Sequence, residues 1–179
     1  SITANAWHHV AISWDYTSTG SYLRIWINGV EATNMTDYFS NNVSNGSIFT
    51  GNASVIFGTT DGTAIAHWGG KIADMRIYDT DLTNTQVSDL YAGTDVQTNL
   101  VGQWLTDNDD LEDKAGTNDG TNSGSVYSID NPPLPLVPSR QASRNFGGIG
   151  SVDRVIISPN TIAGATVLTV SAWIKLDAL

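Results

Sequence analysis

A run of acidic side chains between residues 107 and 119 could bind a metal ion. It holds five Asp and one Glu in thirteen residues, interrupted by Gly and Asn. Calcium takes about six to eight oxygen ligands from carboxylates, amide carbonyls and backbone, so this loop is a candidate calcium site. The strict EF-hand spacing is absent, and turns stabilised by Asx hydrogen bonds explain the same composition.

Acid–base chemistry on sugars would require a different arrangement of carboxylates. Retaining glycosidases place two carboxyl groups about 5–5.5 Å apart, typically with Glu and Asp at alternating positions on one strand. The chain has two glutamates: Glu31 follows a predicted hairpin turn and Glu112 lies in the acidic run, with no Glu-x-Asp-x-x-Glu pattern. We interpret both as surface residues and expect no enzyme activity.

The histidines and serines also lack a catalytic pattern. His8 and His9 point to opposite faces of a regular strand, so they cannot bind one metal ion together, and His67 is the third histidine. A Gly-x-Ser-x-Gly elbow is absent, which leaves a serine hydrolase without support. Because the chain has no Cys, disulfides and zinc–thiolate sites are excluded.

Aromatic side chains indicate a possible carbohydrate site. Tyr22, Arg24 and Trp26 alternate along a predicted strand and oppose the aliphatic side chains between them. One of the two faces of this strand must be an exterior or concave surface, and aromatic rings pack on the apolar faces of sugars. Tyr22, Arg24 and Trp26 are therefore candidate carbohydrate contacts, whereas most of the six Trp are expected in the core.

Four Asn-x-Ser/Thr sequons cluster in one polar stretch, at Asn34, Asn42, Asn45 and Asn52. Their number is close to chance, but their clustering predicts one loop, residues 33–53, that would be glycosylated in an organism with the machinery.

Composition and charge narrow the classes of partner. The 179 residues carry a formal charge of −10 and a pI near 4.3, so a phosphate backbone or an anionic membrane would repel them. No stretch approaches the roughly 18 apolar residues of a membrane span. We expect no nucleic-acid binding and no membrane insertion. Because the chain starts at Ser1 without a signal pattern and stops just after a strand pattern, we expect a piece of a longer protein.

Period-two alternation predicts an all-β fold. Strands are expected at residues 7–14, 22–28, 30–32, 54–59, 71–78, 100–105, 126–129, 154–158 and 167–176. Asn28-Gly29 predicts a type I′ turn. One short helix is expected from Thr83, which has capping-box spacing to Gln86, to the glycine at 93.

Several of these segments resemble a known family. Residues 7–15 (WHHVAISWD), 23–30 (LRIWINGV) and 70–79 (GKIADMRIYD), with the short helix, resemble the second half of a laminin G-like domain. This family belongs to the concanavalin A-like lectin/glucanase superfamily, so the resemblance implies a two-sheet antiparallel jelly-roll sandwich. Similar loops in the family bind a structural calcium, which points to Asp107, Asp113, Asn118 and Asp119 in the acidic run.

The remaining motifs resemble the first half of the same domain. They lie at residues 100–107, 113–121, 144–155 and 168–175. In the family this half precedes the other, usually with a hairpin or two between them. We therefore predict residues 1–93 as a C-terminal half, 94–99 as a linker and 100–179 as an N-terminal half, together one permuted or exchanged sandwich.

Each half alone would expose an apolar face and unpaired edges, so each needs a complement from its own chain or a neighbour. Exchange between neighbours is a head-to-tail contact that gives a ring or a filament. We predict a non-catalytic structural or adhesive repeat unit of a secreted or cell-surface protein, assembling with copies of itself. The alternative is a calcium-dependent lectin-like module whose partners are glycans.

Overall fold

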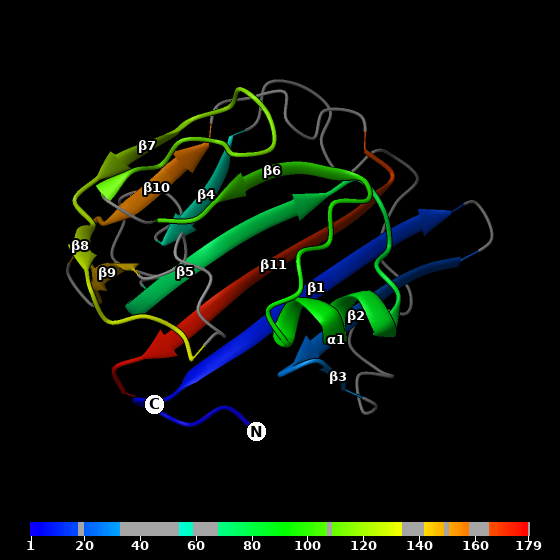
Figure 1. Cartoon of the computed structure of the whole chain (residues 1–179), viewed down its shortest axis with the longest axis horizontal. Coiled ribbons are helices and arrows are strands. Elements are labelled where there is room, and N and C mark those ends of the chain that lie inside the picture. Colours follow the sequence, from blue (N-terminus) through cyan, green and yellow to red (C-terminus); the bar gives the residue numbers. More distant parts are fainter. Residues whose placement is uncertain are drawn as a thin grey trace.

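A computed structural model of the chain describes residues 1–17, 20–32, 54–58, 68–106, 109–133, 142–148, 151–157 and 165–178. Within these residues the chain forms eleven strands and one short helix. The strands lie in two antiparallel sheets (Figure 1). This confirms the prediction of an all-β fold with two antiparallel sheets and one short helix.

The larger sheet has the strand order β3-β2-β1-β11-β5-β9-β8. On the other side of β5 from β11, β9 pairs with the first part of β5 and β6 with the second part. The strands are β1 (Trp7–Thr17), β2 (Gly20–Ile27), β3 (Val30–Glu31), β5 (Gly69–Tyr78), β6 (Leu100–Trp104), β8 (Val126–Ser128), β9 (Ser143–Gly147) and β11 (Val167–Leu176).

The smaller sheet has the order β4-β10-β7 and packs on one face of the larger one. Its strands are β4 (Val55–Gly58), β10 (Arg154–Ile157) and β7 (Gly120–Ser123). Buried apolar side chains fill the space between the sheets, among them Met75, Ile77, Trp104, Phe146, Val155 and Ile157. The alternation of each strand places these residues inward. The sequence patterns do not predict β7 or β9.

Helix α1 (Asn84–Tyr91) covers the opposite face of the larger sheet. It begins as expected: the Gln86 backbone N–H donates to Thr83 Oγ1 (3.3 Å), and the Thr83 N–H donates to Gln86 Oε1 (2.9 Å). Val87 and Leu90 bury its apolar stripe. In the described part of the chain, no helix has the length and hydropathy of a membrane span.

The predicted two-residue turn sits between β2 and β3. Asn28 (φ 52°) and Gly29 (φ 76°) both have the positive φ of a type I′ turn. A Cβ on Gly29 would lie 3.1 Å from the Cβ of Tyr91, so glycine also permits the close approach of α1. The turn therefore fixes the β2–β3 register and also the position at which α1 packs against the sheet.

Strands from the two predicted halves are interleaved at the centre of the larger sheet. β11 lies between β1 and β5 and pairs with both: Ile12 is opposite Val170, and Ile77 is opposite Val170 on the other side. At the ends of these strands, the Asn5 backbone N–H donates to Leu176 O (2.7 Å). Residues 1–93 and 100–178 therefore share one sheet in this chain. The division into 1–93, 94–99 and 100–179 stays a prediction.

Candidate functional site

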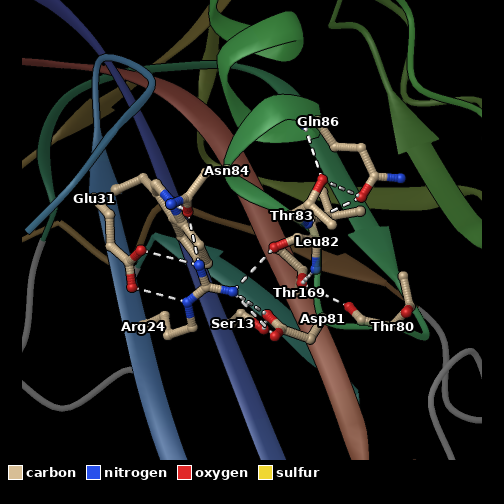
Figure 2. A network of polar contacts seen from close by, with 11 residues as sticks. Ser13, Arg24, Glu31, Thr80, Asp81, Leu82, Thr83, Asn84, Gln86 and Thr169 are labelled. Atoms are coloured by element: carbon tan, nitrogen blue, oxygen red, sulfur yellow. Dashed lines mark hydrogen bonds and ion pairs between the residues drawn. The ribbon is translucent and has the colours of Figure 1, made fainter.

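Arg24 on β2 is the centre of the polar network in Figure 2. Its Nε and Nη2 donate to Glu31 Oε1 and Oε2 (2.8 and 2.9 Å), forming a bidentate ion pair between β2 and β3. Nη1 donates to Asp81 Oδ2 (3.1 Å), and Nη2 donates to Asn84 Oδ1 (2.7 Å). The hydrogen bonds that Arg24 donates to Glu31, with the charge of Asp81, raise the pKa of Arg24, and Arg24 lowers the pKa of Glu31.

The side chain of Trp26 lies beneath this network and is fully buried. Its Nε1 donates to Asn84 Oδ1 (2.8 Å), and the Arg24 guanidinium lies 4.4 Å from the ring centroid. The ring therefore has no face exposed to a sugar, which contradicts the expectation of a stacking platform at Trp26. Trp26 is buried because α1 packs on the face of β2 that carries Arg24 and Trp26. The alternation in the sequence did not indicate that a helix covers this face. The side chain of Tyr22 lies outside the described part.

The same network continues to the strands on the other side of β2. Ser13 Oγ on β1 donates to Asp81 Oδ1 (2.6 Å). Thr169 on β11 donates its hydroxyl to Thr80 O (2.6 Å) and accepts from the Leu82 N–H (3.1 Å). These contacts join three strands to the start of α1. In chemical terms, Arg24 and its partners hold the helix on the sheet.

Asp113 in the acidic loop is buried and is surrounded by backbone N–H groups. Its Oδ1 accepts from Gln103 N and Ala115 N (both 3.0 Å), and its Oδ2 accepts from Asn118 N (3.2 Å). This is the Asx-type turn that the sequence left as the alternative to a calcium site. The carboxylate fixes the loop to β6.

The other expected calcium ligands are also engaged. Asp119 Oδ1 accepts from the Asp113 N–H (3.0 Å), and the Asn118 backbone oxygen accepts from Trp104 Nε1 (3.0 Å). Asp107 lies outside the described residues. Among the residues that are described, no three His, Cys, Asp or Glu side chains form a group that could hold a metal ion. As they stand, these oxygens face N–H donors and do not converge on a cation, so they do not fit calcium.

Replacing Asp113 by Ala is expected to lower the free energy of unfolding by about 2 kcal/mol, because three N–H donors in a mostly buried turn lose their acceptor. Thermal unfolding with calcium and with a chelator measures this loss. We expect the same loss in both conditions. A loss that appears only with calcium would show instead that Asp113 is a metal ligand.

The two glutamates lie in separate ion pairs. Glu31 holds Arg24, whereas Glu112 Oε2 lies 2.6 Å from Lys114 Nζ in the acidic loop. Lys114 also contacts Asp110 (3.1 Å), and these partners raise its pKa. The two glutamates belong to different clusters and therefore do not form a carboxyl pair with each other.

Both histidines of β1 are buried and have structural contacts. His8 Nε2 accepts from the Thr3 N–H (3.1 Å). On the other face, the ring of His9 packs 5.5 Å from that of Trp173 and 6.5 Å from that of Tyr91. Burial lowers the pKa of His9 to about 4, so its ring is neutral at pH 7. His67 and the sequons at Asn34, Asn42, Asn45 and Asn52 lie outside the described residues.

Sequence reasoning missed a buried charge cluster on β5. Arg76, 1% exposed, donates through Nε and Nη2 to Asp74 (2.9 and 3.1 Å) and through Nη1 to Asp95 (2.7 Å). Gln103 of β6 approaches the same Asp74 (3.4 Å). The available signal was the alternation of Asp74 and Arg76 within the otherwise apolar stretch 72–78. The cluster fixes residues 94–99, which follow α1, to the centre of the sheet.

Comparison with known proteins places part of the chain in a family. Residues 1–88 match the laminin G family model described as the concanavalin A-like lectin/glucanases superfamily. No curated protein and no solved structure matches the chain. The matched range contains β1 to β5 and most of α1, and it includes Arg24 with its partners Glu31, Asp81 and Asn84.

Proposed function

Because residues 1–88 belong to the concanavalin A-like lectin/glucanases superfamily, we propose that this chain is a non-catalytic structural or adhesive module of a secreted or cell-surface protein. Laminin G-like domains are generally non-catalytic and typically extracellular. One observation carries the proposal: Glu31, Asp113 and His9 are committed to contacts within the fold. A catalytic group must instead be free to reach a substrate.

Release of reducing ends from a panel of β-glucans tests the non-catalytic part. We expect no turnover by the wild type or by Glu31→Gln. Turnover that disappears in Glu31→Gln, in a variant that keeps its circular dichroism spectrum, would overturn the proposal.

We also propose that the module assembles with copies of itself. Residues 100–178 supply β11, a central strand of the larger sheet that lies between β1 and β5 of residues 1–93. A neighbour's β11 would offer the same cross-strand pairs, so exchange keeps the sheet intact while linking copies head to tail. Size-exclusion chromatography with light scattering over a range of concentrations tests this. Concentration-dependent oligomers are expected, and a monomer at the highest concentration would contradict it.

A second candidate function, carbohydrate binding, is favoured by Tyr91 at the end of α1. Its side chain is among the exposed large hydrophobic residues, at 41%, and its ring stacks on Trp173 at 5.7 Å and 24°. A ring held in this way keeps a surface for the apolar face of a sugar with little entropy to lose. A glycan array, run with and without chelator, tests it. Binding that Tyr91→Ala removes supports it, and no binding in either condition contradicts it.

A further inference from the structure

We propose that the larger sheet carries a site for the carboxylate of an acidic sugar, formed by Trp7, Lys71 and Lys175, and that Asp130 occupies this site within the chain. The inference rests on the second proposed function, carbohydrate binding, and names the ligand class and the site. The site lies on the face of the sheet that α1 covers, beyond the end of the helix.

The three donors form a row across neighbouring strands. Trp7 on β1 is opposite Lys175 on β11, and Lys175 is opposite Lys71 on β5. Side chains in register on adjacent strands lie on the same face, within contact of one another. The row is continuous with the one formed by His9 and Trp173, two residues along each strand.

All three donors converge on one carboxylate. Trp7 Nε1 donates to Asp130 Oδ1 (3.0 Å), and Lys175 Nζ donates to Asp130 Oδ2 (2.8 Å). Lys71 Nζ lies 3.4 Å from the same Oδ2. Although partial burial works to raise the pKa of Asp130, these donors keep it below its usual value. Two ammonium groups and an indole N–H thus recognise a single carboxylate by its charge and by both of its oxygens.

Asp130 reaches the row from outside the strands. It follows β8, in residues 129–133, and Ser143 Oγ donates to its backbone oxygen (2.6 Å). Its side chain is 35% exposed, and Ile129 next to it is 80% exposed. Figure 1 shows this segment and α1 over the same face of the larger sheet. The carboxylate is therefore a surface contact that a ligand can compete with.

The aromatic part of the site is adjacent. Tyr91 stacks on Trp173, which precedes Lys175 by two residues and shares its face of β11. Two residues along a strand span about 6.6 Å, roughly the width of a sugar ring. A sugar packed on Tyr91 would therefore present a ring carboxylate to Lys175. The polar groups set the orientation and the ring supplies apolar contact, as in other small-ligand sites.

The carboxylate of Asp130 lowers the affinity of the site for the carboxylate of a ligand. Asp130 is tethered beside the row, so its effective concentration there is high and a ligand must displace it. Removing its charge leaves two ammonium groups facing one point, in a chain whose net charge is −10. Lys71 Nζ also lies 3.9 Å from Asp177 Oδ1. This second carboxylate reduces the positive charge of the site but does not neutralise both ammonium groups.

Asp130→Asn tests the proposal, with isothermal titration of a galacturonate oligosaccharide and of its neutral galactose counterpart. We expect the variant to bind the acidic oligosaccharide about tenfold or more tightly than the wild type does, and the neutral one unchanged. Asp130→Asn/Lys175→Met should lose the gain. The matched control is Asp110→Asn, which removes a carboxylate from Lys114 in the acidic loop and should gain nothing. Circular dichroism verifies that each variant folds.

The outcomes separate the two proposals. No gain for Asp130→Asn, or an equal gain for Asp110→Asn or for the neutral oligosaccharide, overturns the inference at Asp130 even where the glycan array shows binding. A wild type and variants that bind no glycan at all overturn carbohydrate binding itself. If Asp130→Asn fails to fold, Lys175→Met in the wild-type background decides: a weaker binding of the acidic oligosaccharide supports the site, and an unchanged one overturns it.

Discussion

Replacing Arg76 by Met is expected to lower the free energy of unfolding by about 3–5 kcal/mol, the largest effect we predict for a single side chain. Arg76 is 1% exposed and Asp74 is 6% exposed. Their bidentate contact, at 2.9 and 3.1 Å, neutralises both charges inside the fold. Without the guanidinium, the buried carboxylate of Asp74 loses its counter-charge. Urea denaturation at pH 7 measures the loss.

Two further variants distinguish charge from packing. Asp74→Asn/Arg76→Met should recover most of the stability, because neither charge is then left unpaired; Asn also tolerates the positive φ (46°) of residue 74. Asp95→Asn should cost about 1 kcal/mol or less, because the side chain of Asp95 is 50% exposed. A loss below about 1 kcal/mol for Arg76→Met would contradict the importance that we give to the pair.

Acidification is expected to destabilise the protein through His9. Burial lowers the pKa of His9 to about 4, against about 6.5 in the unfolded chain. Below pH 6.5 the unfolded chain therefore binds a proton that the folded chain does not, so stability falls with pH until about pH 4 and then levels off. The loss from this residue is about 3 kcal/mol. The charges that act on it are those of Asp74, which raises its pKa, and Arg76, which lowers it.

The free energy of unfolding, measured by urea denaturation between pH 7 and 4, checks this expectation. His9→Phe keeps an aromatic ring against Trp173 and Tyr91 but cannot bind a proton. Its stability should fall less over this range than that of the wild type, while carboxylate titrations contribute equally to both. Parallel curves for the two proteins would show that His9 is not the titrating group.

Local patterns predicted most of the elements. The alternation around Trp14 and Trp26, the Asn28–Gly29 turn and the Thr83 cap are properties of short segments, and the structure has β1, β2, the turn and α1 there. The sequence did not predict β9, because Ser143–Gly147 has no alternation of apolar residues. Its Arg144 is buried because Asp109, 35 residues away, pairs with it at 2.7 Å.

The candidate sites were less predictable than the strands. The sequence indicated that Trp26 and Arg24 share a face, which is correct, but it could not indicate that α1 covers that face. It left calcium binding and an Asx turn open for Asp113, and only the positions of three backbone N–H groups favour the turn. The contact of Trp7 with Asp130 spans 123 positions and has no local signal.

The sequence by itself determined that this protein is an all-β fold with one capped helix, because periodicity, turn residues and caps act over a few residues. The tertiary structure alone decided which face of the larger sheet each layer covers. It also decided that strands of the two predicted halves are interleaved at the centre of one sheet, and that Lys71, Lys175 and Trp7 contact Asp130. These outcomes depend on strand register and on the docking of segments that are far apart in the chain. Contacts between such segments determine which side chains are buried and which charges are paired.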